Sequence, residues 1–177
     1  MTIRPTRPEE AALLSDLALR SQACWGYAPD FLERAIPALA IDTADITRRQ
    51  AFVAERAGGV FGFYCLEGTA PEFGLGLVFV APEHTGIGVG ATLFEHAKME
   101  VRRRQGTALL IESNPNAEAF YVRMGAEHIA DVPSESEAGR RLPLLRLQLL
   151  RPGRALPRRV HVPYGLYGET PMTDSRP

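Results

Sequence analysis

A run of alternating glycines is the first feature of the sequence that can do chemistry. Three glycines stand within five positions, in the segment Thr85-Gly86-Ile87-Gly88-Val89-Gly90-Ala91. Glycine lets the backbone turn with positive φ and lets a ligand approach without a Cβ in the way. An amphipathic helix is predicted to follow, marked by apolar residues that recur every four positions: Val89, Leu93, Ala97 and Val101. The unpaired N–H groups at the start of this helix, and the positive end of its dipole, would face the space beside the glycines. The segment therefore favours a pyrophosphate site over a strand-to-helix turn without a ligand.

A dinucleotide-binding fold is one way to use such a turn. The segment 86–91 fits the pattern G-x-G-x-x-A, and Glu112 follows about 20 residues on, where a ribose ligand stands in that fold. The turn, however, lies five residues beyond the preceding strand, and the residues before it do not alternate between strands and helices. A Rossmann-type NAD(P)-binding protein therefore stays as the less favoured alternative.

The elements around the turn predict an α/β protein. A strand at 72–80, a helix ending at Gly106 and an almost wholly apolar strand at 107–111 form a βαβ unit, so the two strands should be parallel. The expected upstream elements are a short strand at 3–5, helices starting near 8 and 29, and a hairpin of strands at 50–55 and 60–66. The expected downstream elements are a short helix at 114–125 and strands at 126–131 and 142–150.

Composition limits the class of protein. With 177 residues, 45% of them hydrophobic, the chain suits one globular domain at 1–150, followed by a tail at 151–177 that contains five prolines. A net charge of −1 gives no reason to expect nucleic acid or an anionic membrane as a partner. No signal peptide or apolar span is visible, so a cytoplasmic protein is predicted. Cys24 and Cys65 are expected to be buried reduced thiols, and no metal site is expected.

Two segments stand out together: Val80-x-Pro82-Glu83-x-x-Gly86-x-Gly88-x-Gly90, and Asn114-x-x-Ala117-x-x-Phe120-Tyr121-x-x-x-Gly125-Ala126. In this order and at this distance they closely resemble the two signature segments of the GNAT superfamily of acetyl-CoA-dependent N-acetyltransferases. The resemblance implies the GNAT fold, a mixed central sheet of about six to seven strands flanked by helices. It also implies that the sheet is splayed between the parallel strands at 72–80 and 107–111, with acetyl-CoA in the gap.

The resemblance gives individual residues a role in binding the cofactor. The backbone of Val78 and Val80 would pair with the pantetheine arm, and Asn114 matches the family's cofactor-contacting asparagine. The pyrophosphate would lie on the turn formed by Thr85, Gly86, Ile87, Gly88, Val89, Gly90 and Ala91. Thr85 departs from the family, which usually carries Arg or Gln there. A hydroxyl brings no charge, so cofactor affinity is expected to fall unless Arg102 or another cation compensates.

Acetylation of an amine needs a neutral amine, a stabilised oxyanion and a proton for the departing thiolate. A lysine-like amine with a pKa of about 10.4 is charged at neutral pH, so a base must remove its proton directly or through water. The backbone N–H of Val78 would stabilise the oxyanion. Tyr121, which matches the family's tyrosine near the thiol, would return a proton to the thiolate, whose pKa is about 8.5 if it resembles cysteine. Packing beside Phe120 is the alternative role of this ring.

The base is predicted from strand alternation. If no bulge intervenes, one face of the strand at 72–80 carries Glu72, Gly74, Gly76, Val78 and Val80. The glycines would leave room for an acceptor, with Glu72 at the rim as the catalytic base. A solvated carboxylate at the strand end is an equally open interpretation. Glu67 and Glu112 are weaker candidates, and His84 is expected to be a surface side chain.

The sequence thus predicts an N-acetyltransferase that moves an acetyl group from acetyl-CoA to a primary amine of a small-molecule acceptor, by direct attack in a ternary complex. The segment Trp25-Gly26-Tyr27 lies where this family builds the acceptor wall, although ordinary core packing explains it equally well. A non-catalytic acyl-CoA-binding protein of the same fold is the main alternative. The acceptor is not predicted, and a homodimer is left open.

Overall fold

The computed structural model describes residues 1–134, 137 and 139–149. The predicted tail at 151–177 lies outside the described residues. None of the helices in the described part of the chain is long and apolar enough to cross a bilayer.

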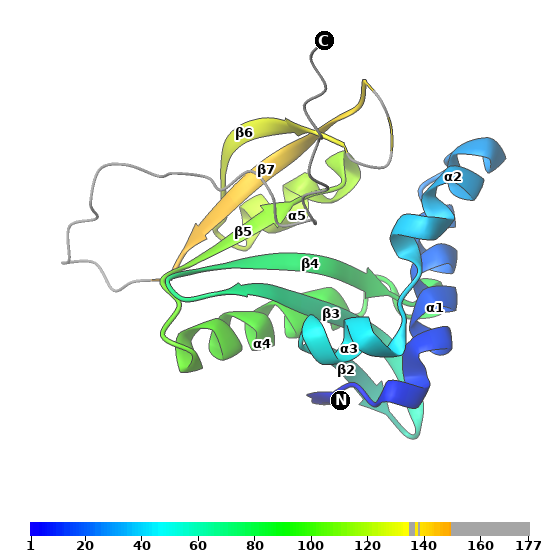
Figure 1. The fold of residues 1–177 in the computed structure, drawn as a ribbon, viewed down its shortest axis with the longest axis horizontal. Helices are drawn as coiled ribbons and strands as arrows, with labels where there is room; N and C mark the ends of the chain where they lie inside the picture. The colour runs from blue at the N-terminus through cyan, green and yellow to red at the C-terminus, as the bar shows by residue number, and fades with distance from the viewer. Residues whose placement is uncertain (135–136, 138, 150–177) are drawn as a thin grey trace, which may run out of the picture.

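A seven-stranded mixed sheet forms the centre of the molecule (Figure 1). Its strands are β1 (Thr2–Pro5), β2 (Ala51–Arg56), β3 (Gly59–Thr69), β4 (Glu72–Val80), β5 (Ala108–Glu112), β6 (Glu127–Pro133) and β7 (Arg141–Gln148). They follow the order β1-β2-β3-β4-β5-β7-β6. All neighbouring pairs among these strands are antiparallel except β4 and β5, which are parallel as predicted. A doubly wound parallel sheet is therefore excluded, and the Rossmann-type alternative is wrong.

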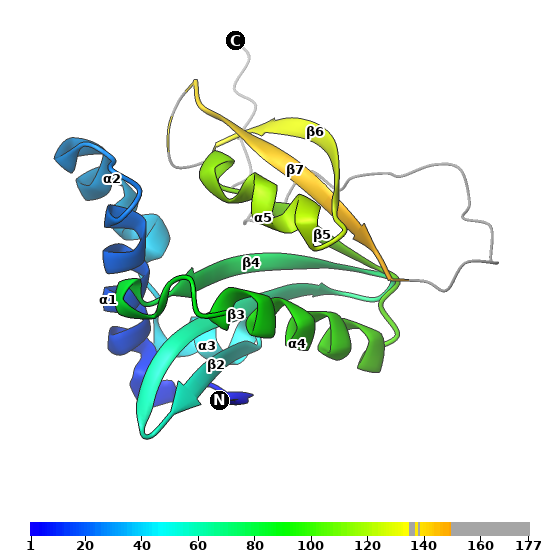
Figure 2. The same cartoon turned by 180° about the vertical axis from the view of Figure 1, so that it is seen from behind.

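Helices cover both faces of this sheet, as Figures 1 and 2 show from opposite sides. On one face lie α1 (Ala11–Ala23), α2 (Pro29–Leu39) and α3 (Thr43–Arg48), whose apolar residues share a core cluster with β2 and β3. On the other face lie α4 (Val89–Arg103) and α5 (Glu118–Arg123). Buried residues of α4, including Leu93, Phe94 and Ala97, pack with Tyr121 of α5 against β4, β5 and β7. The four-residue spacing read from the sequence is thus the buried stripe of α4.

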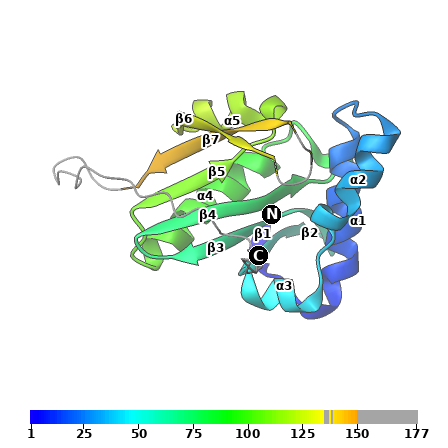
Figure 3. The same ribbon diagram turned by 45° about the horizontal axis from the view of Figure 1, so that its top comes forward.

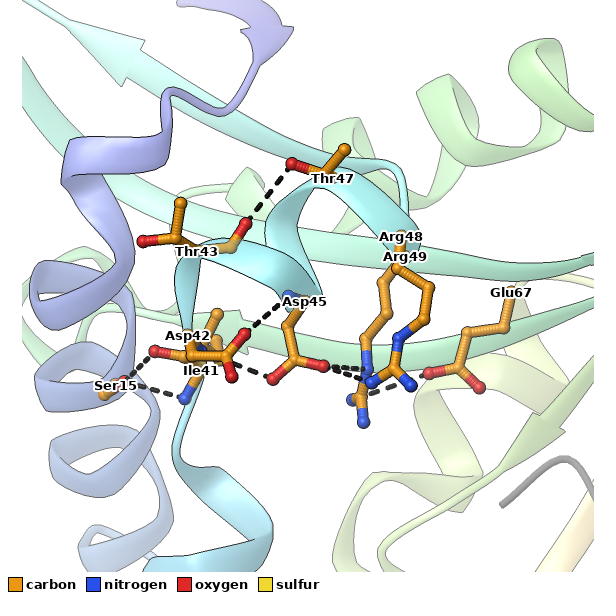
Figure 4. Close-up of polar contacts among 9 residues, drawn as sticks. All are labelled: Ser15, Ile41, Asp42, Thr43, Asp45, Thr47, Arg48, Arg49 and Glu67. Carbon is orange, nitrogen blue, oxygen red and sulfur yellow. Dashed lines mark hydrogen bonds and ion pairs between the residues drawn. The ribbon is translucent and has the colours of Figure 1, made fainter. Parts of the chain in front are cut away.

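The sequence interpretation missed α3, although the residues for its start were present. The Asp42 side chain accepts a hydrogen bond from the Asp45 backbone N–H, and the Asp45 carboxylate accepts one from the Asp42 backbone N–H. This reciprocal pair is a capping box that uses Asp in place of the usual Ser and Glu. Asp45 also forms an ion pair with Arg49, whose guanidinium reaches Glu67 of β3 at 3.5 Å (Figure 4). The short helix is therefore fixed to the sheet by charged side chains.

The parallel strands β4 and β5 separate along their length. Their register runs only from Glu72 opposite Ala108 to Leu75 opposite Ile111, so Gly76 to Val80 have no partner on β5. In Figure 1 the two strands converge at one end and diverge toward α1 and α2, and Figure 3 shows β5, β7 and β6 with α5 as a separate wing. The predicted splay is therefore present, and it leaves the second half of β4 with an open edge.

A β-bulge interrupts β4 where the strands part. Tyr64 pairs with Val78 and Leu66 with Leu75, so Gly76 and Leu77 both stand opposite the single residue between Tyr64 and Leu66. The bulge shifts the alternation of faces by one residue. Leu75 and Val78 consequently pack on the α4 side, together with Phe73 and Val80, whereas Leu77 and Phe79 pack on the α1–α3 side. The prediction that Glu72, Gly74, Gly76, Val78 and Val80 share one face is wrong for this reason.

Candidate active site

The glycine turn between β4 and α4 has the predicted positive φ at two of its three glycines, and the third, Gly90, lies in α4. Gly86 and Gly88 have φ of 81° and 87°, and Gly88 is the N-cap of α4. A Cβ added to either glycine would meet no atom of the described chain within 4 Å. Residues 85–88 are exposed to solvent. The turn therefore presents backbone N–H groups and a helix N-terminus to open space, which is the arrangement that binds a phosphate group.

A cavity of about 730 Å³ joins this turn to the splay between β4 and β5. Its volume is in the range of ordinary cofactor and substrate sites. The cavity brings together most of the residues predicted to bind the cofactor: Val78, Val80, Thr85, Gly86, Gly88, Val89, Gly90, Ala91 and Asn114. Ile87 is not among the lining residues, and its side chain is 65% exposed. We call this cavity the main cleft.

Asn114 stands where β5 ends, and its side chain is held in place by two hydrogen bonds. Its amide oxygen accepts one from the backbone N–H of Asn116 at 3.0 Å, which caps the 3₁₀ turn Pro115–Ala117. The Tyr27 hydroxyl donates the second at 2.9 Å. With the oxygen engaged in this way, the Asn114 amide NH₂ is the group left to donate to a ligand in the cleft.

Tyr27 also connects the main cleft to the segment between β6 and β7. Arg140 donates a hydrogen bond to the Tyr27 hydroxyl at 2.8 Å, and its guanidinium lies 5.1 Å from the Tyr27 ring centroid and 4.9 Å from that of Phe31. Cation–π contacts of this kind fix a guanidinium in orientation. The sequence interpretation missed Arg140, because a single arginine in a loop rich in Ser, Glu and Gly carries no local signal.

Tyr121 lies in the wall of the main cleft, on α5. Its side chain is 7% exposed, and its ring packs edge-on against Phe94 and Phe120 at centroid distances of 5.4 and 5.0 Å. Burial raises the pKa of the Tyr121 hydroxyl, because the phenolate would lose its hydration. The described residues provide no hydrogen-bond partner for this hydroxyl. Tyr121 therefore remains protonated at neutral pH, with its proton available to a ligand.

The structure does not bring the predicted base Glu72 to the cleft. Glu72 stands at the closed end of the splay, opposite Ala108, and its carboxylate forms an ion pair with Arg146 of β7. Glu67 also lies outside the lining, although one carboxylate oxygen is 2.9 Å from the position that a Cβ on Gly76 would occupy. Arg49 pairs with Glu67, as Figure 4 shows. Both carboxylates therefore form ion pairs with arginines that do not line the cleft.

Glu112 is the carboxylate that lines the main cleft within the described residues. It ends β5 at the open side of the splay, and its side chain is exposed. The neighbouring Ser113 is buried, and its hydroxyl donates to the Asn114 carbonyl at 2.8 Å. His84 lines the cleft as well, stacked on Phe61 with the ring centroids 3.5 Å apart.

Two further predictions are corrected by the geometry. Arg102 lies 13 residues beyond the start of α4, about 20 Å along the helix from the turn, so it cannot compensate for Thr85. The arginines that line the cleft in the described chain are Arg123 and Arg140.

The two cysteines differ in burial. Cys24 follows the end of α1, is exposed and lines the cleft, which corrects its prediction as a buried thiol, whereas Cys65 is buried as predicted. Burial raises the pKa of the Cys65 thiol to about 12.

Both the sequence and the fold match known proteins. A family model described as an acetyltransferase (GNAT) domain matches residues 47–125. A curated 5-NmdU N-acetyltransferase from Pseudomonas phage PaMx11 is 32% identical over 148 residues, which make up 82% of this chain and 98% of the phage protein. The chain belongs to the GNAT family of N-acetyltransferases, and it is therefore an acyltransferase.

Solved structures agree on the fold. A GCN5-related N-acetyltransferase from Rhodopseudomonas palustris superposes with a TM-score of 0.71 at 22% identity, over 84% of this chain and 95% of that one. The PaiA N-acetyltransferase from Thermoplasma acidophilum, solved in complex with coenzyme A, superposes with a TM-score of 0.69 at 18% identity, over 83% and 98% of the two chains. The GNAT fold predicted from the sequence is confirmed.

Proposed function

We propose that this protein transfers the acetyl group of acetyl-CoA to a primary amine by direct attack in a ternary complex. The observation that carries the proposal is the main cleft itself. One continuous cavity contains the glycine turn at the α4 N-terminus, the open edge of β4 and the Tyr121 ring. A pyrophosphate on the turn and a pantetheine arm along Val78 and Val80 would direct the thioester toward Tyr121.

The backbone on the phosphate side would bind the cofactor through the positions predicted from the sequence. The amides of the turn from Thr85 to Ala91 would donate to the pyrophosphate, with the α4 dipole adding to the attraction. Asn114 would donate its amide NH₂ to the cofactor. Thr85 contributes a hydroxyl and no charge, so Arg123, on α5 beside the cleft, is the cation we assign to the phosphate side.

Three groups would act on the reacting atoms. The amine nitrogen attacks the thioester carbon, and the backbone N–H of Val78, next to the β4 bulge, would donate to the oxyanion that forms. As the intermediate collapses, the carbon–sulfur bond breaks and the thiolate leaves. The Tyr121 hydroxyl would donate a hydrogen bond to that thiolate. Because burial raises the Tyr121 pKa well above that of a thiol, the hydroxyl keeps its proton and stabilises the thiolate by hydrogen bonding, without the full proton transfer expected from the sequence.

We assign Glu112 as the acceptor of the amine's proton, directly or through a water molecule. The assignment rests on its position, since Glu112 is the carboxylate in the described lining of the cleft. If it acts as the base, Glu112→Gln should lower kcat/KM most at neutral pH. Activity should recover as the pH rises toward the pKa of the amine, because the free amine then needs no base.

Calorimetric titration with acetyl-CoA, and with NADH as control, tests the cofactor site first. Binding of acetyl-CoA at micromolar strength without binding of NADH is the expected result. Thiol release from acetyl-CoA in the presence of primary amines then tests the transfer. The acceptor in the name of the phage relative, 5-NmdU, is the first amine to assay.

A non-catalytic acyl-CoA-binding protein of the same fold would bind acetyl-CoA but release no thiol with any amine, and Tyr121→Phe would leave its binding unchanged. Membership of an N-acetyltransferase family and the catalytic groups in the cleft favour transfer. The cytoplasmic location and the small-molecule acceptor remain predictions, and the question of a homodimer stays open.

A further inference from the structure

The wall of the main cleft that would hold the acceptor is formed by the end of α1, the residues that follow it and α2. Ser21 and Gln22 of α1 contribute polar side chains, and the apolar residues of the wall are Trp25, Phe31, Ala35, Ala38 and Leu39. Trp25, the one tryptophan of the chain, is 45% exposed, although large apolar side chains are usually buried. A large ring that lines a cleft and remains open to solvent offers a flat apolar face to a ligand.

The charged groups among the described residues around this wall disfavour one class of acceptor. In the described lining of the main cleft, the carboxylate is Glu112, and the arginines are Arg123, which we assign to the phosphate side, and Arg140, which is paired with Glu137. A second cavity of about 540 Å³ shares Phe31, Asn116 and Arg140 with the main cleft. Its charged lining is balanced, since Arg34 pairs with Asp30 and Glu137, and Arg140 also pairs with Glu137. Neither cavity has a surplus of carboxylates among the described residues.

A polyamine or an amino sugar with several amines keeps one or more positive charges after the reacting amine has lost its proton. Those charges need carboxylates in the pocket to replace the water that they give up. In the described lining Glu112 is the one carboxylate, and the proposed transfer already uses it as the base, so none is left there for a second cation. An acceptor with a single amine carries no further cation once Glu112 has taken its proton, and its apolar part can lie on the wall.

We propose, on the basis of the proposed acetyl transfer, that the acceptor is a primary amine attached to an aromatic ring and that it carries no second positive charge. The ring stacks against Trp25, next to Phe31, and its amine points toward Glu112 and the thioester. Trp25 is thus a specificity-determining residue of the acceptor site.

A panel of three amines tests the proposal through thiol release from acetyl-CoA. Benzylamine supplies the aromatic ring, cyclohexylmethylamine supplies a saturated ring of the same size, and spermidine supplies additional cations. We expect kcat/KM for benzylamine to exceed that for spermidine by at least about tenfold, and that for cyclohexylmethylamine by about fivefold, the scale of one aromatic contact. Equal or faster acetylation of spermidine, or no preference for the aromatic ring, would overturn the proposal.

Two variants of Trp25 link the preference to the wall. Trp25→Ala should raise KM for benzylamine about fivefold and leave the KM for acetyl-CoA unchanged, whereas Trp25→Phe should keep the aromatic preference. Ile36→Ala is the matched control, because Ile36 is 48% exposed on α2 and does not line the cleft. Equal effects of Trp25→Ala and Ile36→Ala would refute the role of Trp25. If acetyl-CoA binds but no amine in the panel, nor 5-NmdU, is acetylated, the proposed function fails as well; preference for spermidine refutes the acceptor class alone.

Discussion

Gly88→Ala is the substitution that most directly tests the phosphate turn. Gly88 has a φ of 87° and caps α4, in a region of backbone space that costs an alanine about 1 kcal/mol. No atom of the described chain lies within 4 Å of the new Cβ, so the protein itself does not clash with it. The unfolding midpoint should therefore fall by only about 2–4 °C in a chain of this size.

The effect on binding should be larger, because the methyl group points into the space where the pyrophosphate would lie. Loss of one hydrogen bond to a charged phosphate oxygen costs about 1.5–3 kcal/mol. At 1.4 kcal/mol for each factor of ten, the Kd for acetyl-CoA should rise about ten- to 150-fold. Calorimetric titration measures the Kd, and thermal unfolding followed by circular dichroism measures the stability.

Gly58→Ala is a matched control for the same strain. Gly58 has a φ of 81°, also has no atom within 4 Å of a new Cβ, and lies in the β2–β3 hairpin outside the cleft. It should lower the stability by a similar amount and leave the Kd unchanged. The reasoning is refuted if Gly88→Ala binds acetyl-CoA as tightly as the wild type, or if both variants weaken binding equally.

Four further predictions concern the cleft and the residues behind it. Tyr121→Phe should leave the Kd for acetyl-CoA unchanged and lower kcat about 100-fold, because the thiolate loses its hydrogen-bond donor; an unchanged kcat in steady-state assays would assign the ring to packing alone. Glu112→Gln should show its largest loss of kcat/KM near pH 7 and a smaller loss near pH 10; a loss independent of pH would contradict its role as base. Glu72→Gln removes a part-buried ion pair with Arg146, so it should lower the free energy of unfolding by about 1 kcal/mol in a denaturant titration and leave kcat unchanged; a fall in kcat with unaltered stability would restore Glu72 as the base. Iodoacetamide at pH 8 should modify Cys24 rapidly and leave Cys65 intact until the protein is denatured, since Cys65 is buried and its pKa is raised to about 12; mass spectrometry of the labelled peptides detects the difference.

The elements of the fold were largely predictable because their signals are local. The helix stripe from Val89 to Val101, the apolar strand before Glu112 and the Gly58-Gly59 hairpin each depend on neighbours in the chain, and all three formed as expected. The helix α3 was missed because it has only six residues, and its capping box uses two aspartates, Asp42 and Asp45. A short helix of this kind depends on tertiary contacts such as the Arg49–Glu67 pair more than on its own periodicity.

The glycine turn was predictable from the sequence, and the rest of the cleft was not. The turn is a continuous segment in which the positive φ angles of Gly86 and Gly88 follow from residue type. The rest of the cleft combines Trp25, Glu112 and Arg140, which come from three distant segments. Arg140 had no recognisable pattern before the fold placed it against Tyr27 and Phe31.

By itself, the sequence determined the family, the parallel pairing of β4 with β5 and the glycine turn before α4, since these follow from motifs and from the periodicity of single segments. The tertiary structure alone decided which carboxylate faces the cleft. Strand alternation pointed to Glu72, but one extra residue in β4 shifted the faces of the strand. Arg146 of β7, on the far side of β5, forms an ion pair with Glu72 at the closed end of the splay. Register and bulges arise from pairing between distant strands, so periodicity within one strand cannot reveal them.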